Sequence, residues 1–267
     1  APGDDMYFEP EFDEPDMEIS YDTVEMEMDF EMDFNMEMPE EVNRILTDRI
    51  SDYLFCPTQT SIDNLMNEGY QNINCKIVNS GDVMQDAANF YALSSEKKAT
   101  VSKTIGLTDF ILCTLHRAEN TDDPKRLSAI IEALNEINLT TPVLLPLHPR
   151  TKKIILGLGL TLSFKTIDPV GYFDMIELLK KCILVMTDSG GLQKEAYFFK
   201  KNCITLRDQT EWVELLENNV NVLVGANKAT IIKETKRMLT QSSDFSIDLY
   251  GNGNACKNIV DELLISI

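Results

Sequence analysis

The sequence has no long apolar run, only two histidines and a single tryptophan. No stretch approaches the roughly 20 apolar residues that a membrane helix needs, so we expect no membrane partner. The first residues form neither a basic nor an apolar segment, which predicts no signal peptide and a cytoplasmic protein. Neither metal-ligand spacing nor the Gly-x-x-x-x-Gly-Lys phosphate loop occurs, and we expect neither a metal nor a nicotinamide cofactor.

Basic side chains are missing from the first 41 residues, which carry 17 acidic ones. The whole chain has 44 Asp and Glu and 24 Lys and Arg, so the other 226 residues hold 27 acids against 24 bases. This near-neutral body has no basic stripe to hold a phosphate backbone, and we expect no nucleic acid partner.

Six cysteines occur without a Cys-x-x-Cys pair, mostly inside apolar runs: Cys56, Cys75, Cys113, Cys182, Cys203 and Cys256. Such a distribution is typical of reduced, buried thiols in a cytosolic protein, not of a disulfide framework or a zinc site. A length of 267 residues with 43% hydrophobic residues fits one large globular domain or two small ones.

Residues 1–38 form an acidic head rich in Met and Phe, which ends in a near-alternation of acidic and apolar residues over 25–34. Acidic-hydrophobic sequence is often disordered, whereas alternation is the period of a half-buried strand. A solvated tail, an edge strand and an interaction arm are the three interpretations open for this head.

From Pro39 onward, short apolar runs alternate with amphipathic segments. Pro39 followed by two acids predicts a helix start. The expected strands lie near 54–56, 76–79, 109–114, 142–147, 164–167, 183–186, 203–206 and 221–224. Further helices are expected near 58–68, after Asp123, and at 172–181, 192–200, 211–217, 229–240 and 254–264. This order predicts an α/β fold with a doubly wound, Rossmann-like parallel sheet, whose ligands bind beyond the carboxyl ends of the strands.

A glycine pair stands between the strand at 183–186 and the helix after it. Gly190 and Gly191 let the backbone approach a ligand closely, and the new helix offers free N–H groups to a phosphate or diphosphate. Ser189 adds a hydroxyl donor, and Glu195 is placed to accept hydrogen bonds from a ribose diol. A tight turn without a ligand is the alternative interpretation.

Both histidines directly follow predicted strands, and each has an arginine one or two residues on. His116 and Arg117 precede Glu119 and Asn120, and His148 precedes Arg150. A third polar cluster, 207–212, contains Arg207, Thr210 and Glu211 after the strand at 203–206. Three arginines at one edge of the sheet favour an anionic small molecule. A lone histidine is usually a packing residue, but two such pairs at one edge favour ligand contact.

In order and spacing these motifs resemble the non-hydrolysing UDP-N-acetylglucosamine 2-epimerase family, from Pro39 to the C-terminus. The matching segments are 39–44, 81–84, 114–120, 148–150, 171–172, 187–196, 207–211 and 250–254. The segment 211–215, Glu-Trp-Val-Glu-Leu, replaces the family's commoner Glu-Arg-Pro-Glu and is closer to the branch acting on UDP-2,3-diacetamido-glucuronate.

The resemblance implies a two-domain fold like the GT-B glycosyltransferases, with residues 39–86 ending the N-terminal Rossmann-like domain. Residues 87–267 then form the C-terminal UDP-binding domain, with a last helix packing back. It also implies inversion at C2 of a UDP-N-acetyl amino sugar by elimination and re-addition of UDP, for cell-surface polysaccharide precursors. This reaction needs a base, an acid and stabilisation of the leaving diphosphate.

The resemblance also assigns roles to individual residues. Glu40, Arg44 and His116 correspond to catalytic positions of the family. Ser189, Gly190 and Gly191 correspond to phosphate ligands, Glu195 corresponds to the ribose ligand, and Val170 and Met175 fall where the family holds uracil.

Family members begin with a Rossmann-like half about twice the size of what precedes residue 87, and its Gly-Thr-Arg-Pro-Glu and His-Val-Glu-Ala-Gly motifs do not occur in residues 1–38. The missing half is supplied by a partner chain, or the chain is a fragment or remnant, or the sequence is incomplete there. The expected partner is a second copy of this chain, in a homodimer, or a partner chain that supplies the missing half.

A nucleotide-sugar epimerase is the first functional hypothesis. A non-catalytic UDP-sugar-binding subunit is the second, and a glycosyltransferase of the same fold is the third.

Overall fold

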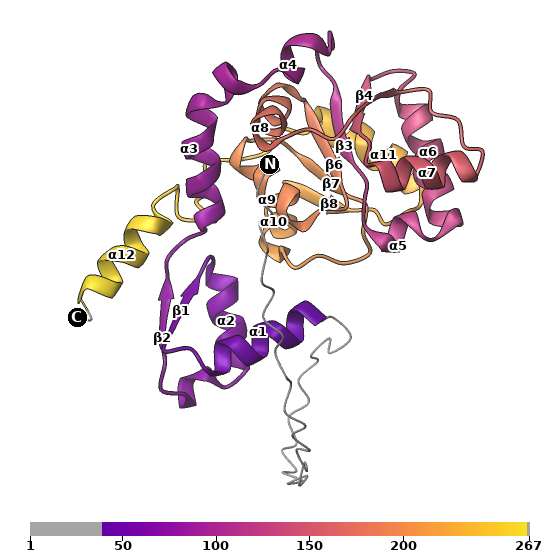
Figure 1. Cartoon of the computed structure of the whole chain (residues 1–267). Coiled ribbons are helices and arrows are strands. Elements are labelled where there is room, and N and C mark those ends of the chain that lie inside the picture. Colours follow the sequence, from indigo (N-terminus) through magenta and orange to yellow (C-terminus); the bar gives the residue numbers. More distant parts are fainter. Residues whose placement is uncertain (1–38, 266–267) are drawn as a thin grey trace, which may run out of the picture. The chain divides into compact units, whose positions relative to one another are not determined.

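The structure is a computed structural model that describes residues 39–265 (Figure 1). The interpretations of the head, residues 1–38, lie outside this described part. The chain divides into two units after Arg44, so residues 39–44 belong to the first and 45–265 to the second. Helix α1, Pro39–Arg49, spans the division and begins where Pro39 and the acids after it predict a helix start.

Six parallel strands form the main sheet of the second unit, in the order β5-β4-β3-β6-β7-β8. Their bounds are Ile111–Thr114 for β3, Val143–Pro146 for β4, Lys165–Ile167 for β5, Leu184–Thr187 for β6, Cys203–Thr205 for β7 and Asn221–Leu223 for β8. The predicted doubly wound parallel sheet is therefore confirmed, with every one of these strands within a few residues of its predicted range.

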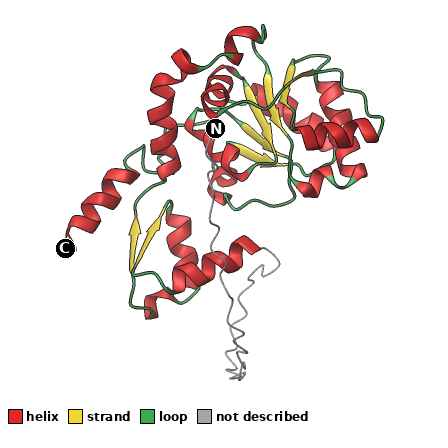
Figure 2. Cartoon of the chain, viewed as in Figure 1, coloured by secondary structure: helices red, strands yellow, loops and turns green. Residues whose placement is uncertain are grey.

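Helices cover both faces of this sheet, as Figure 2 shows. On one face pack α6 (Pro124–Ile137), α7 (Pro149–Gly157) and α11 (Lys228–Thr240); on the other lie α8 (Tyr172–Lys181) and α9 (Gly190–Phe198). The side chains of strand β3 alternate between these two layers: Ile111 and Cys113 point into the first, and Leu112 points into the second. Strands buried on both faces read as continuous apolar runs, which made them predictable.

The strand order reverses between β3 and β6, which lie side by side at the centre of the sheet. Their last residues, Thr114 and Thr187, are register partners, and the two hydroxyl oxygens lie 2.6 Å apart. The crossovers leave in opposite directions here, so the loops diverge and leave room for a ligand beyond the strand ends.

A second, two-stranded parallel sheet precedes the main one along the chain. It pairs β1 (Tyr53–Cys56) with β2 (Lys76–Asn79), connected by α2 (Gln59–Asn67) and the short helix η1 (Tyr70–Asn72). Leu54, Cys56, Leu65 and Tyr70 form its small apolar core.

Sequence periodicity did not predict α3 (Val83–Lys98) or α7. Helix α3 has no clean apolar stripe: Phe90 and Leu93 face solvent, whereas the buried Ser95 donates to Glu177 of α8 at 2.6 Å. The remaining helices are α4 (Val101–Thr104), α5 (Ala118–Thr121), α10 (Val213–Glu217) and α12 (Ala255–Ile265). The domain boundary expected after residue 86 stays a prediction.

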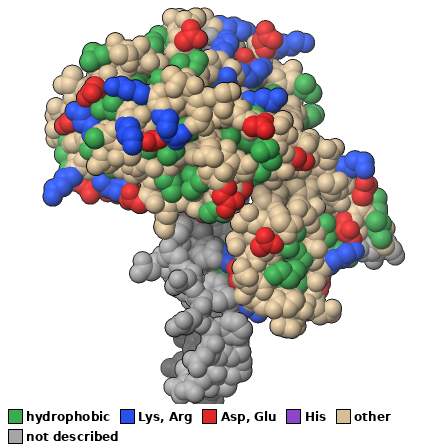
Figure 3. Space-filling view, turned by 180° about the vertical axis from the view of Figure 1, so that it is seen from behind, with side chains coloured by type: hydrophobic (Ala, Val, Ile, Leu, Met, Phe, Trp, Pro, Cys, Tyr) green, Lys and Arg blue, Asp and Glu red, His purple; other side chains and the backbone are tan. Residues whose placement is uncertain are grey.

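The surface carries charges of both signs. On the face drawn in Figure 3, Lys and Arg side chains are interspersed with Asp and Glu. Among residues 39–265, no helix is both long and apolar enough to cross a membrane.

Candidate functional site

The loops beyond β3, β6 and β7 converge at the point where the strand order reverses. The turn after β6 begins α9 with Ser189 as its N-cap, and Ser189 Oγ accepts the Leu192 N–H at 3.4 Å. Gly190 and Gly191 are the first two residues of this helix, so their N–H groups have no acceptor within it. These N–H groups lie at the positive end of the helix, where the sequence predicts an anion site, and that role stays a prediction.

The rest of the protein leaves room for a larger residue at either glycine. A Cβ added to Gly190 would lie no closer than 3.5 Å to another atom, and one added to Gly191 would meet only Met84 Cε, also at 3.5 Å. Both are ordinary van der Waals distances, and neither glycine has a positive φ.

Asp188, between β6 and the glycine turn, organises the neighbouring loop. It is fully buried and accepts the backbone N–H groups of His116 at 3.0 Å and Arg117 at 2.9 Å. It was not predicted from the sequence, although an acid directly after a wholly buried strand was a usable signal. A buried carboxylate must find several donors, and here it finds them in the backbone of the loop after β3.

His116 is half-exposed and its Nδ1 lies 3.2 Å from Asp188 Oδ1. Nδ1 therefore lies beside the buried carboxylate, which leaves Nε2 for a ligand. The predicted position of His116 at the ligand edge agrees with this geometry.

Arg117, Arg207 and Glu211 come together beside the turn. The Cβ position at Gly190 lies 3.9 Å from Arg117 Nη2 and 3.8 Å from Glu211 Oε2. Arg207 is buried and donates to both Glu211 oxygens at 2.9 Å, while its Nε has no partner in the described part of the chain. Burial alone would raise the pKa of Glu211, but the Arg207 hydrogen bonds hold this pKa below its ordinary value.

Glu195 lies one and a half turns into α9 and is mostly buried. Burial raises its pKa above the ordinary value of a glutamate, although the hydroxyl of Tyr172 donates to it and acts in the opposite direction. Burial, together with Glu195, raises the pKa of Tyr172 to about 12. Tyr172 begins α8, so the start of α8 meets the second turn of α9 here.

The other predicted ligands take part in local structure. Asn120 donates to the carbonyl of Leu206 at 2.8 Å and accepts from Arg126, which also pairs with Glu119. Arg150 pairs with Asp122 at 2.6 Å, and His148 Nδ1 caps α7 by accepting the Arg150 N–H at 3.3 Å. Their roles as ligands stay predictions.

Thr210 donates to Gln193 at 2.8 Å, and Val170 and Met175 pack at the edge of the apolar core under α8. Glu40 and Arg44 both lie on α1, in the first unit, and their catalytic roles also stay predictions.

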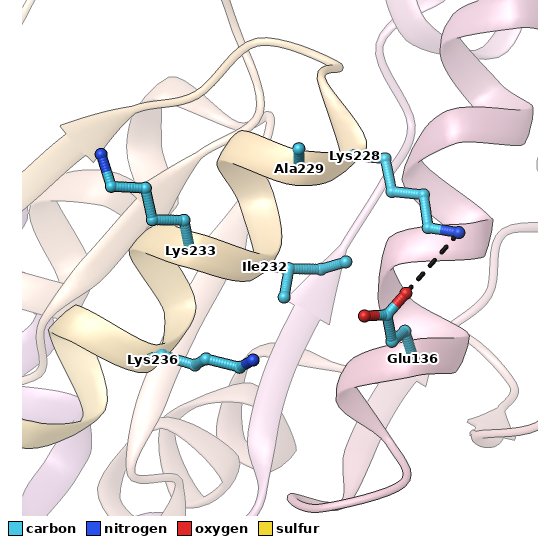
Figure 4. A pocket seen from close by; sticks show the side chains of 6 residues that line it. All are labelled: Glu136, Lys228, Ala229, Ile232, Lys233 and Lys236. Atoms are coloured by element: carbon cyan, nitrogen blue, oxygen red, sulfur yellow. Dashed lines mark ion pairs between the residues drawn. The ribbon is translucent and has the colours of Figure 1, made fainter.

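A shallow groove of about 680 Å³ lies away from these loops, between α6 and α11 (Figure 4). It is lined by Glu136, Lys228, Ala229, Ile232, Lys233 and Lys236, and Lys228 pairs with Glu136 at 3.6 Å. None of the predicted site residues lines it, so the converging loops remain the candidate site. In the described residues no three His, Cys, Asp or Glu side chains gather closely enough to hold a metal ion.

Comparison with known proteins points in the same direction. Residues 32–264 match the family model described as UDP-N-acetylglucosamine 2-epimerase. The chain is 55% identical over 227 residues to the UDP-2,3-diacetamido-2,3-dideoxy-D-glucuronate 2-epimerase of Pseudomonas aeruginosa, covering 85% of this chain and 63% of that protein. It is 40% identical over 235 residues to the UDP-N-acetylglucosamine 2-epimerase of Methanocaldococcus jannaschii, covering 84% and 63%.

Solved structures agree with the sequence relatives. The chain matches the Methanocaldococcus jannaschii UDP-GlcNAc 2-epimerase in complex with UDP-GlcNAc and UDP, with a TM-score of 0.77, 39% identity and coverage of 87% and 66%. It also matches the Neisseria meningitidis UDP-GlcNAc 2-epimerase bound to UDP-GlcNAc, with a TM-score of 0.71, 30% identity and coverage of 85% and 65%. The chain thus spans 63% of the length of the curated relatives named above.

Proposed function

Because the chain belongs to the UDP-N-acetylglucosamine 2-epimerase family, we propose that the glycine turn after β6 binds the diphosphate of a UDP-sugar. The six-stranded sheet corresponds to the C-terminal half of a GT-B-like two-domain fold. The observation that carries the proposal is the convergence of free helix N–H groups, Arg117 and His116 at one reversal point.

The reaction proposed for the complete protein is epimerisation at C2 by elimination and re-addition of UDP. Charge grows on the diphosphate as the bond to C1 breaks, and we propose that the N–H groups of α9 and the Nε2–H of a doubly protonated His116 stabilise it. Glu40 is proposed for proton transfer and Arg44 for a catalytic contact beside it, since an arginine keeps its proton in a protein. The proposed reaction uses no metal and no nicotinamide.

Calorimetry with UDP tests the binding step on this chain. Glu195→Ala removes the proposed ribose acceptor and is expected to weaken UDP binding about ten-fold or more, the loss of roughly 1.5–3 kcal/mol. A folded mutant that binds UDP as well as the wild type would show that the assignment is wrong.

A UDP-2,3-diacetamido-glucuronate is the substrate we favour over UDP-N-acetylglucosamine. The support is the 55% identity to the Pseudomonas enzyme of that name, against 40% to the Methanocaldococcus enzyme. Competition between the two sugars for the UDP site, measured on one preparation, distinguishes them.

We propose that catalysis also requires groups outside the residues described. A two-stranded parallel sheet is seldom stable alone, and β1 and β2 each keep an edge to which further strands can add. A partner chain or a further segment would supply them; a homodimer is the alternative. Exchange of solvent deuterium into C2 by this chain alone, at an enzymatic rate, would contradict this requirement.

A non-catalytic UDP-sugar-binding subunit is the second candidate function. It predicts UDP binding without deuterium exchange, even when the further half is supplied. We place the protein in the cytoplasm, which is supported by six cysteines that are all free thiols.

A further inference from the structure

The single tryptophan of the chain lies directly behind the glycine turn. Trp212 is half-buried in the loop after β7, and its indole Nε1–H donates to the carbonyl oxygen of Gly190 at 2.9 Å. This bond links two loops that are 22 residues apart in the sequence. None of the site roles described above involves Trp212.

The hydrogen bond from Trp212 acts on the orientation of the peptide plane between Gly190 and Gly191. The carbonyl of Gly190 and the N–H of Gly191 belong to the same planar trans peptide, so they point in opposite directions. A donor that holds the carbonyl from behind therefore aims the Gly191 N–H toward the front of the turn. This peptide is the first one of α9, where helix ends fray, and glycine has no side chain to restrict it, so a donor from outside the helix adds to its constraint.

A buried ion pair holds the indole ring in turn. Lys194 Nζ lies 4.1 Å from the centre of the Trp212 ring and 2.6 Å from Asp82 Oδ2, and both charged side chains are more than nine-tenths buried. The cation lies over the ring face, which is the favourable position for such a contact. Asp82 is itself fixed, because its Oδ1 accepts the Met84 N–H at 2.8 Å as the N-cap of α3.

We propose that Trp212 is a positioning residue for the diphosphate, held in place by the Lys194–Asp82 pair. It does not touch the ligand but sets the direction of the Gly191 N–H that does. The inference rests on the proposed binding of a UDP-sugar at this turn. It predicts that the indole contributes to recognition of the diphosphate and not of the nucleoside.

Trp212→Phe tests the proposal, since it keeps an aromatic face for Lys194 and removes the indole N–H donor; the volume lost with the second ring is measured by the thermal stability. We expect UDP affinity to fall about five- to ten-fold, as for one lost hydrogen bond, while uridine affinity is unchanged. Tyr197→Phe is the matched control: it removes a side-chain hydrogen bond to the Ile247 carbonyl from the same helix α9. Both variants should lose similar thermal stability, but only the first should lose UDP affinity.

The outcomes separate this inference from the proposed function. A wild-type chain that does not bind UDP contradicts both. Wild-type binding with an unchanged UDP affinity in Trp212→Phe contradicts the inference alone, and so does an equal loss for UDP and uridine.

Fluorescence gives a second measurement, because Trp212 is the only source of tryptophan emission. We expect UDP to shift or quench the emission and uridine to leave it unchanged. Asp82→Asn with Lys194→Met neutralises the pair without leaving one charge buried alone, and should alter the ligand-free emission and lower UDP affinity several-fold. Asp261→Asn with Lys257→Met, an exposed pair at 2.6 Å, is the control. Wild-type emission and affinity in the first double variant would overturn the role of the pair.

Discussion

His116 Nδ1 lies 3.2 Å from one oxygen of the buried Asp188, and the other oxygen accepts the backbone N–H of His116 at 3.0 Å. One carboxylate thus fixes both the backbone and the side chain of the histidine. The contact joins the ends of β3 and β6, which are neighbours in the sheet but 72 residues apart in the chain.

Asp188→Asn should destabilise the protein markedly. The amide would set an N–H₂ group against backbone N–H donors that now point at a carboxylate, and a buried donor without an acceptor costs roughly 1–3 kcal/mol each. Chemical denaturation measures the change. Asp261→Asn, at an exposed acid, is the control, and an equal effect in both variants would contradict a structural role for Asp188.

His116→Asn should act on turnover in the complete protein. If Nε2 stabilises the leaving diphosphate, its loss lowers the turnover rate about 10²–10³-fold, the usual effect of removing one such donor, with a smaller change in substrate binding. Steady-state kinetics and a thermal melt on the same preparation give the answer. An unchanged turnover rate at saturating substrate would end the catalytic assignment.

The fold was predictable because its strands are continuous apolar runs, as in Ile111–Thr114, and parallel strands end at one edge. Residues that follow those strands, such as His116 and Ser189, were therefore expected at this edge, and they follow β3 and β6 in the structure. Helix α3 was not predicted, because Phe90 and Leu93 face solvent while Ser95 faces inward.

Contacts between side chains that are distant in the sequence could not be predicted in this way. His116–Arg117 and His148–Arg150 are similar patterns, yet Arg117 lies beside Gly190 whereas Arg150 pairs with Asp122. The Lys194–Asp82 contact joins residues 112 positions apart, and no periodicity encodes it.

Gly190→Ala separates ligand binding from stability. The added methyl group meets no protein atom closer than 3.5 Å, and alanine is the better helix former by up to about 1 kcal/mol, so the free energy of unfolding should stay constant or rise. UDP affinity should nevertheless fall more than ten-fold, because the methyl group would lie 3.9 Å from Arg117 Nη2, beside the turn where we propose that the diphosphate binds.

The control for this variant is Gly157→Ala in α7, another helical glycine with open space around it. It should leave UDP affinity unchanged in calorimetry. A Gly190→Ala variant with wild-type affinity would mean that no ligand approaches the turn closely.

Glu195 should make UDP binding depend on pH in a characteristic direction. Burial raises the pKa of this carboxyl group in the folded protein, so its neutral form persists to a higher pH than in an ordinary glutamate. Folding stability contributed by this group is present at low pH and is lost as the pH rises through the raised pKa. UDP binding has the opposite dependence, because a ribose diol donates best to the carboxylate. Affinity should therefore decline as the pH falls through the raised pKa, above the range of an exposed glutamate.

The phosphate of UDP also titrates, and Glu195→Gln controls for this because it has no charge to lose. At neutral pH the glutamine variant should bind UDP roughly five-fold more weakly, the difference between a charged and a neutral acceptor. The ratio of wild-type to variant affinity, measured by calorimetry at each pH, should approach one at low pH. A ratio that stays constant across the range would show that Glu195 does not contact the ligand.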